Sequence, residues 1–331
     1  MVTAGIDVGS KELIIVIQSQ KKTSKPFSFT NDFEGHKKLI QLLKKKKVTR
    51  ICLEATGVYH LDISVLLYDH PLFELMVINP KAAKHYAQVM MNRTKTDGVD
   101  ALLLAGYAQH MPFVVWQRPN DRCLAVRACA RRLSALTKQS TQAKNQLHAL
   151  QSTGITPEFI NDDVKLTIEQ LALQITALRG KSLELIEQDT EMSQLLSLLI
   201  SVKGIAENSA IQLMGELLVL PKDMTARQWV AMAGLDPRQH QSGSSINKKA
   251  RISKVGNRYL RMALYMPALS ASRSDLHVRG YYLHLIEQRG LKKIQAICAV
   301  MRKLLHAIHG MFKSGMPFDN KRFYHLTEQT E

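Results

Sequence analysis

The sequence predicts a mixed α/β domain at the N-terminus, a helical middle segment and a mainly α-helical C-terminal domain. Three short apolar stretches lie close together before residue 31, and helical and extended patterns alternate from there to residue 80. Two long stretches of helical periodicity follow, and further helical patterns fill the last third. At 331 residues the chain is long enough for two domains, each with its own core.

The composition is that of a folded protein with an unusual charge. Hydrophobic residues make up 45% and charged residues 22%, both within the ordinary range. The net charge of +17 indicates a polyanionic partner, most commonly nucleic acid. From Ser242 to Ser314 there are 14 Lys or Arg residues against two acids, so most of this excess lies in one stretch. An architectural protein would show the same charge, and charge alone does not separate binding from catalysis.

The four cysteines are scattered, without a CxxC pair or a His at zinc-ligand spacing. We therefore expect small buried hydrophobic side chains, not disulfides or metal ligands. The first ten residues lack the pattern of a signal peptide, and no apolar run reaches the length of a membrane span. These features predict a cytoplasmic protein without a membrane partner.

The N-terminal pattern predicts a sheet with an acidic residue at the end of two strands. The expected strands are 4–10, 13–17, 26–30, 50–54 and 73–78, with helices at 33–47 and 59–68. In the ribonuclease-H-like arrangement of this pattern, the first and fourth strands are parallel neighbours. Asp7 and Glu54 would then emerge side by side at the carboxyl ends of the strands, where open α/β sheets hold their sites.

Two more acids open a later helix. After a helix at 81–91, Thr96 is a suitable N-cap, and Asp97 and Asp100 share a face because they are three residues apart. Alternatively, both acids only complement the helix dipole. With Asp7 and Glu54 converging nearby, we predict a site for Mg²⁺, with Mn²⁺ as a substitute, since hard cations prefer carboxylate oxygens. Two such ions about 4 Å apart clamp the oxygens of a phosphoryl transfer.

The middle of the chain predicts two helices. An extended connector at 112–119 precedes a helix at 121–151, a break at 152–157 and a second helix from residue 162. Apolar positions three and four residues apart suit either an antiparallel hairpin within one chain or a coiled-coil dimer interface. A helix–turn–helix follows at 200–218 and resembles a helix-hairpin-helix phosphate contact, but Ala206 takes the place of the second glycine.

The basic stretch begins with the loop Gln241–Ser245, after a short helix that ends at Gly234. These serines are either a solvated turn or nucleophiles, since a hydroxyl becomes reactive beside a base, a metal or stabilising charge. Ser242, Ser244 and Ser245 are all candidates. The cations that follow are candidate nucleic-acid-binding residues: Lys248, Lys249, Arg251, Lys254, Arg258 and Arg261. The first four of them would also stabilise a pentavalent phosphate. We place the domain boundaries at 1–118, 119–195 and 196–316, with a tail at 317–331.

Several segments together resemble the DEDD transposases of the insertion-sequence one-ten group, to which the pilin-gene invertases belong. They are GIDVGSKEL, ICLEATGVY, KTDGVDALLLA, VKGIAENSA, AMAGLDPR, SGSS, SKVGNRYLRMALYMPA and KSGMPF. The resemblance implies a RuvC-like N-terminal domain, a helical coiled-coil region and a C-terminal transposase domain with a serine nucleophile. It assigns the four catalytic, metal-binding acids to Asp7, Glu54, Asp97 and Asp100, and the nucleophile to Ser242.

The resemblance also implies partners and an intermediate. It implies a covalent 5′-phosphoserine link to donor and target DNA, which are recognised through a structured guide (bridge) RNA encoded by the element. It implies a homo-oligomer, a dimer and in the synaptic state a dimer of dimers, in which one protomer's acids face another's serine. The expected location is the nucleoid of a bacterial cell. Two alternatives stay open: a RuvC-like junction nuclease that uses water as nucleophile, and a non-catalytic nucleic-acid-binding protein whose affinity falls steeply with salt.

Overall fold

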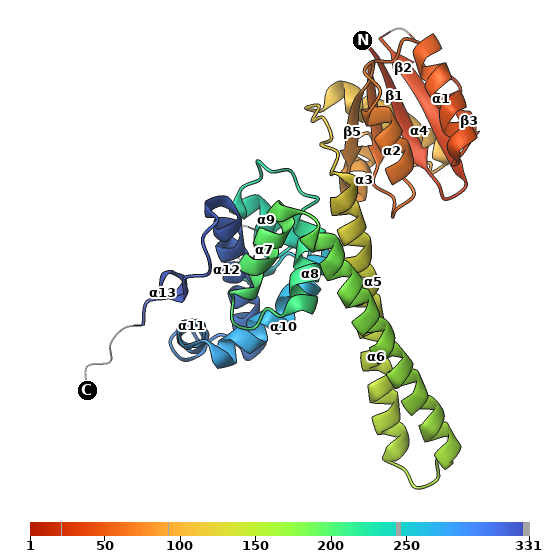
Figure 1. Cartoon of the computed structure of the whole chain (residues 1–331). Helices are drawn as coiled ribbons and strands as arrows, with labels where there is room; N and C mark the ends of the chain where they lie inside the picture. The colour runs from red at the N-terminus through yellow and green to blue at the C-terminus, as the bar shows by residue number, and fades with distance from the viewer. Residues whose placement is uncertain (21, 92, 243–245, 327–331) are drawn as a thin grey trace. The chain divides into compact units, whose positions relative to one another are not determined.

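The computed structural model describes residues 1–20, 22–91, 93–242 and 246–326, without the side chains of residues 239–250. The chain divides into two compact units, Met1–Arg118 and Pro119–Glu331 (Figure 1). All four cysteines are free; Cys52 and Cys123 are buried, and the other two are half-buried.

The N-terminal unit is built on a five-stranded mixed sheet, as the sequence predicts. Strands β1 and β2 form a meander with β3, and β4 and β5 extend the sheet on the other side of β1, in the order β3-β2-β1-β4-β5. The pairs β1–β2 and β2–β3 are antiparallel, whereas β1–β4 and β4–β5 are parallel. The first and fourth strands are therefore parallel neighbours. The bounds are β1 Val2–Val8, β2 Glu12–Ser19, β3 Phe27–Thr30, β4 Arg50–Glu54 and β5 Glu74–Ile78.

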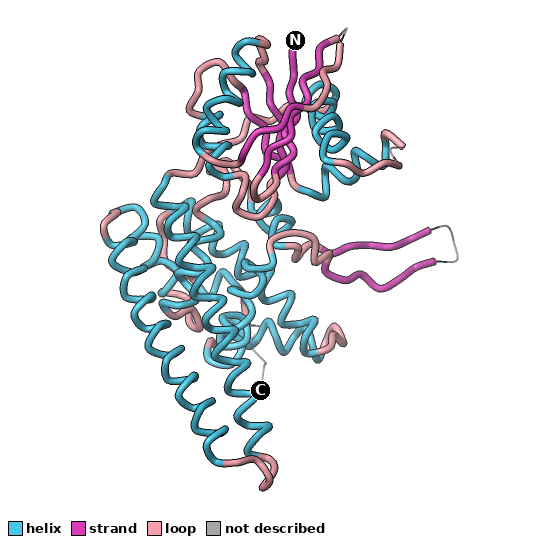
Figure 2. Tube along the Cα trace, turned by 90° about the vertical axis from the view of Figure 1, so that its right-hand side faces the viewer, coloured by secondary structure: helices cyan, strands magenta, loops and turns pink. Residues whose placement is uncertain are grey.

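Helices cover both faces of this sheet (Figures 1 and 2). On one face α1 and α2 bury Leu39, Leu43, Ile63 and Leu67 against β1 residues such as Ile6. On the other face α4 buries Leu104 and Ala108 beside Cys52 and Met76. The bounds are α1 Phe33–Lys45, α2 Leu61–Tyr68, α3 Pro80–Val89 and α4 Asp97–His110.

The alternation of side chains across a strand decides which residues face α4. Ala4, Ile6 and Val8 of β1 lie in the core formed with α1 and α2. Gly5 and Asp7 alternate with them and so lie on the α4 face. The same rule places Cys52 and Glu54 of β4 on the α4 face, because Ile51 and Leu53 belong to the other core. Both strand-end acids therefore share one face of the sheet.

The C-terminal unit begins with a long helical hairpin. Helices α5 (Asp121–Gln151) and α6 (Glu158–Glu187) run side by side, joined by a short connection (Figures 1 and 2). Helix α6 begins at Glu158, four residues before the predicted start, with Pro157 as its N-cap residue. The first half of α5 contributes Val126, Ala130 and Leu133 to the core of the C-terminal helices.

The rest of this unit is mainly helical. Buried side chains of α8, α10 and α12 form its centre, among them Leu213, Leu264 and Leu304. None of the helices that the structure describes is long and apolar enough to cross a membrane. The bounds are α7 Thr190–Ile200, α8 Glu207–Leu217, α9 Ala226–Ala233, α10 Arg258–Ser274, α11 Leu276–Glu287, α12 Lys293–Ser314 and α13 Asn320–Phe323.

A β-hairpin interrupts these helices where the sequence predicts only a polar loop. Strands β6 (Pro237–Ser242) and β7 (Ile246–Ile252) pair antiparallel from Pro237–Ile252 to Ser242–Ile246 (Figure 2). The segment PRQHQS contains no apolar alternation, so hydrophobic patterning gives no signal for this strand. Residues 243–245, which include Ser244 and Ser245, lie outside the described residues.

The glycine turn that resembles a helix-hairpin-helix has a packing role. Gly204, between α7 and α8, has a φ of +100°. A Cβ atom there would lie 2.8 Å from the Ala271 nitrogen and the Pro267 oxygen of α10. The close approach of α10 and the positive φ both explain why glycine occupies this position.

Candidate active site

Asp7 and Glu54 lie beside each other where β1 and β4 end. The parallel ladder pairs Ile6 with Leu53, so the next residue of each strand is an acid. Glu54 is also paired with Ile78 of β5. Both acids are half-buried and lie on the α4 face of the sheet. The sequence prediction of two adjacent acids at the carboxyl ends of the strands agrees with this register.

Helix α4 brings the other two acids to the same place. Its first turn carries Asp97 and Asp100, and the Thr96 hydroxyl caps it by accepting a hydrogen bond from Val99 N at 3.3 Å. One to two turns later, Ala101 and Ala105 pass directly over Gly5. A Cβ atom on Gly5 would lie 2.0 Å from the Ala101 oxygen, so only glycine permits this approach.

The charges of these four residues influence one another. The pKa of Asp7 is raised to about 6, mainly by burial and then by repulsion from Asp97, Asp100 and Glu54. Burial and Asp100 likewise raise the pKa of Glu54, whereas Lys95 lowers it. The four predicted acids therefore form one electrostatic group within the N-terminal unit.

This group fits a hard divalent cation by its chemistry. All four side chains offer carboxylate oxygens, the ligands that Mg²⁺ prefers. A bound cation would relieve the repulsion that raises the Asp7 pKa. Among the described residues, no three His, Cys, Asp or Glu side chains are already gathered closely enough to hold a metal ion. The carboxylates would thus have to close around a cation by side-chain rotation.

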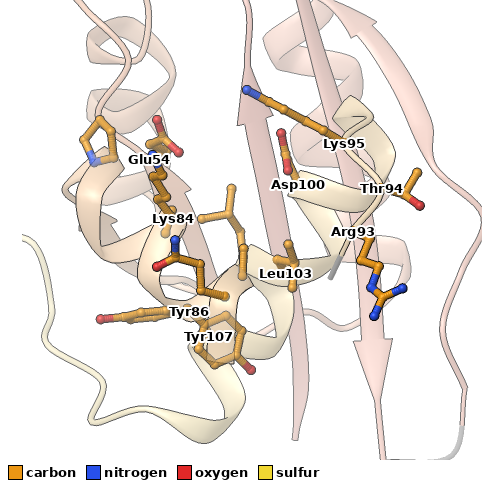
Figure 3. Close-up of a pocket in the computed structure, with 14 residues that line it drawn as sticks. Glu54, Lys84, Tyr86, Arg93, Thr94, Lys95, Asp100, Leu103 and Tyr107 are labelled. Carbon is orange, nitrogen blue, oxygen red and sulfur yellow. The ribbon is translucent and has the colours of Figure 1, made fainter. Parts of the chain in front are cut away.

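A pocket of about 540 Å³ opens beside two of these acids, between α3 and α4. Figure 3 shows Glu54, Asp100 and Lys95 at one end of this pocket and Tyr86 and Tyr107 at the other. No motif or periodicity in the sequence marks the cations and tyrosines here as site residues. Their only signal in the sequence is their position, just before or within the elements that flank the acids. The charged and aromatic lining residues other than the acids are Lys84, Tyr86, Arg93, Lys95 and Tyr107.

Ser242 belongs to the other unit. It is the last residue of β6, and its backbone is paired with Ile246. Its side chain lies outside the described residues, as do those of Lys248 and Lys249. The structure therefore gathers the four acids in one unit and places the predicted nucleophile at the tip of a hairpin in the other.

The remaining predicted cations of the C-terminal unit differ in their surroundings. Arg251, Lys254 and Arg258 are exposed. Arg261 is half-buried, and its guanidinium donates a hydrogen bond to the Ala233 oxygen at 2.8 Å, at the end of α9. Burial lowers the pKa of Arg261. Arg261 thus secures the end of α9. Arg251 and Lys254 are available to a polyanion, and so is the exposed Arg258, whose guanidinium donates a hydrogen bond to the Tyr259 hydroxyl at 3.2 Å.

Two stretches of the chain match known sequence families. Residues 4–153 match a DEDD family described as "Transposase", and residues 196–283 match the "Transposase IS116/IS110/IS902 family". The chain is 30% identical over 302 residues to the pilin gene-inverting protein of Moraxella bovis. This match covers 89% of this chain and 90% of that protein. It is 31% identical over 306 residues to the pilin gene-inverting protein of Moraxella lacunata, with the same coverage.

One solved structure is also similar to part of the chain. It is T. thermophilus RuvC in complex with a Holliday junction substrate, at 14% identity and a TM-score of 0.27. The alignment covers 34% of this chain and 96% of that one.

Proposed function

This chain belongs to the IS110 family of DEDD transposases and pilin gene-inverting proteins, and we propose that it cleaves and rejoins DNA through a serine nucleophile. Membership of the family establishes a DNA transposase or recombinase. The serine, the metal and the guide RNA are the proposed details. The observation that supports metal-assisted cleavage best is the convergence of Asp7, Glu54, Asp97 and Asp100 on one face of the sheet.

In the proposed reaction, the Ser242 hydroxyl oxygen attacks a DNA phosphorus atom and loses its proton. The new O–P bond forms as the bond to the 3′ oxygen breaks, which leaves a 5′-phosphoserine and a free 3′-hydroxyl. A 3′-hydroxyl of another strand then attacks this phosphorus and releases the serine, so the number of phosphodiester bonds is conserved. A hydroxyl is a poor nucleophile at neutral pH, so the attack of Ser242 needs a base, a metal or stabilising charge.

The four acids would hold Mg²⁺ or Mn²⁺, which when bound neutralises charge on the scissile phosphate. Asp7, half-buried and repelled by its neighbours, would serve as a ligand from the sheet, and Asp97 and Asp100 as ligands from α4. Lys248, Lys249, Arg251, Lys254 and Arg258 would hold the DNA backbone near the serine. Of the predicted cations with described side chains, Arg261 fits this role least, because it is half-buried and its guanidinium donates to the Ala233 oxygen.

We infer that donor and target DNA are the substrates and that a guide RNA encoded by the element selects them. The net charge of +17 supports a polyanionic partner of either kind. Sequencing the nucleic acid that co-purifies with the protein tests the RNA. The guide RNA would be contradicted if the protein carried only unrelated cellular RNA and stayed active after that RNA was removed.

A homo-oligomer is supported by an exposed apolar row on α6. Phe159, Leu166 and Leu173 are seven residues apart, and 70%, 54% and 72% of each is exposed. Residues at this spacing lie on one side of a helix and suit a helix of a second copy. Leu166→Lys with Leu173→Lys is expected to halve the mass measured by light scattering. An unchanged mass would rule out this row as the interface.

The nucleophile is tested with serine variants and DNA labelled beside the cut. Wild-type protein is expected to form a labelled protein–DNA adduct on a denaturing gel, and Ser242→Ala to abolish it. Ser244→Ala and Ser245→Ala are the matched controls, and both should retain the adduct. Cleavage without any adduct would instead indicate a nuclease that uses water. An adduct retained by Ser242→Ala would refute the assignment.

A further inference from the structure

The pocket between α3 and α4 has an apolar body. Its walls include Ala83 and Ala87 from α3 and Leu103 and Leu104 from α4. At its base the Tyr86 and Tyr107 rings meet edge to face, with centroids 5.2 Å apart. The Tyr86 hydroxyl is 3.0 Å from Nδ1 of His110, which fixes the ring in place. The pocket therefore offers a preformed apolar and aromatic surface.

Three cations line the same pocket. Lys84 comes from α3, and Arg93 and Lys95 come from the segment that leads into α4. All three are exposed, and none takes part in the ion pairs found between residues that the structure describes. Lys95 lies close enough to Glu54 to lower the pKa of that carboxyl. Lys84 and Arg93 lack a carboxylate partner within ion-pair distance, so these two charges are available to an anionic ligand.

An apolar body beside free cations suits a flat base that is attached to a phosphate. The volume of about 540 Å³ lies within the range of roughly 300–1,000 Å³ typical of small-ligand sites and is too small for a duplex. Stacking and apolar contacts with aromatic side chains hold unpaired bases without strong sequence preference. A single unpaired nucleotide is the ligand that matches both halves of the pocket.

The position of two candidate catalytic acids indicates which strand would provide this nucleotide. Glu54 and Asp100 line one end of the pocket, so a nucleotide bound there is adjacent to the phosphate that these acids act upon (Figure 3). We propose that the pocket takes up one unpaired nucleotide of the DNA strand next to the scissile phosphate. The phosphates that flank this nucleotide lie against Lys84 on the α3 side of the pocket and against Arg93 on the opposite side (Figure 3). This inference rests on the proposed function, because it assigns a subsite of the same active site.

Photocrosslinking tests the pocket directly. The probes are a single-stranded thymidylate oligomer that contains 5-iododeoxyuridine and the matching RNA oligomer with 5-iodouridine, each irradiated with the full-length protein. We expect a DNA adduct on Tyr86 or Tyr107, identified by peptide mass spectrometry. Lys84→Ala with Arg93→Ala should lower its yield about tenfold or more, as expected when charge-assisted hydrogen bonds are lost.

Matched variants separate the pocket from general effects of charge and folding. Lys81→Ala removes an exposed cation of the same helix that does not line the pocket, and its adduct yield should stay unchanged. Ala87→Trp fills the pocket without changing charge and should abolish the adduct, with circular dichroism confirming the fold. An equal adduct in the filled variant, no DNA adduct in the wild type, or an adduct with the RNA probe alone would overturn the proposal.

The phosphoserine assay distinguishes failure of the pocket from failure of the proposed function. A DNA crosslink in the pocket without any Ser242 adduct would retain the pocket and reject the serine mechanism. Normal Ser242 adducts in the Ala87→Trp variant, with unchanged affinity for DNA, would retain the mechanism and reject the pocket.

Discussion

Replacing Asp7 with asparagine is expected to stabilise the metal-free protein while it abolishes activity. The folded protein raises the pKa of this carboxyl from an ordinary value of 3.8 to about 6, because burial and three neighbouring acids disfavour its charge. That difference corresponds to an upper value of about 3 kcal/mol. Since Asp7 is only half-buried, solvent screening reduces the effect, and we expect about 1–2 kcal/mol.

The sign of this effect depends on pH. A carboxyl with a raised folded-state pKa binds more protons when folded, so its unfavourable contribution grows as pH rises from 3.8 to about 6. Above pH 6 the full destabilisation is present, and asparagine removes it. Below pH 3.8 the carboxyl is protonated in both states, and the variant should gain little. The stabilisation by Asp7→Asn should therefore be clear at pH 8 and close to zero near pH 3.5.

Tryptophan fluorescence can measure this unit alone. The chain has two tryptophans, and Trp116 lies in the N-terminal unit, where its backbone nitrogen donates to the Leu75 oxygen. With Trp229→Phe as the common background, urea unfolding in EDTA reports on the sheet that carries Asp7. Adding Mg²⁺ should stabilise the background protein more than the Asp7→Asn variant, because a ligand that binds the folded state adds stability.

A single outcome would refute this reasoning. If Asp7→Asn lowers the free energy of unfolding at pH 8 in EDTA, the carboxylate makes favourable contacts that outweigh its burial and repulsion. The electrostatic description of the four acids would then be wrong. The control is Asp62→Asn, which should change the free energy of unfolding little. Asp62 is an exposed acid of α2 and is not among the residues that raise the Asp7 pKa.

The remaining predictions concern the close packing at Gly5, with Gly180 as its control, and a buried cluster of ion pairs at Glu216. Gly5→Ala should destabilise the N-terminal unit by about 3 kcal/mol in urea unfolding and reduce DNA cleavage, because the added methyl group displaces α4 with its two acids. Gly180→Ala in α6 has free space around it and should stabilise its helix by about 0.5–1 kcal/mol; equal effects at the two glycines would disprove the role of the close approach. Glu216→Gln should lower the free energy of unfolding by about 3–5 kcal/mol, because the buried Glu216 carboxylate binds Arg131 at 2.8 Å and faces Arg127 at 3.6 Å. The measurement is urea unfolding followed by circular dichroism. Wild-type stability of this variant would show that the cluster contributes nothing.

The sequence predicts the strands and helices of the N-terminal unit more completely than those of the C-terminal unit. In the N-terminal unit, apolar runs marked the strands, and the acids at the strand ends and at the start of α4 followed from those elements. In the C-terminal unit the helices were predicted from their periodicity, but the hairpin β6–β7 was not, because its polar segment carries no apolar alternation. Arg261 looked like its neighbours in the sequence, and only the structure distinguishes it, by its burial and by its hydrogen bond to the Ala233 oxygen.

The sequence by itself determined the family and the order of strands and helices in the N-terminal unit, and it predicted the four acids, since local patterns and motifs are written in consecutive residues. Only the tertiary structure decided that Gly5 lets α4 pack directly on β1. It also decided that burial and repulsion raise the Asp7 pKa, and that α3 and α4 enclose a pocket beside Glu54 and Asp100. These properties depend on distances between residues far apart in the chain. Such distances are set by the packing of helices against a sheet.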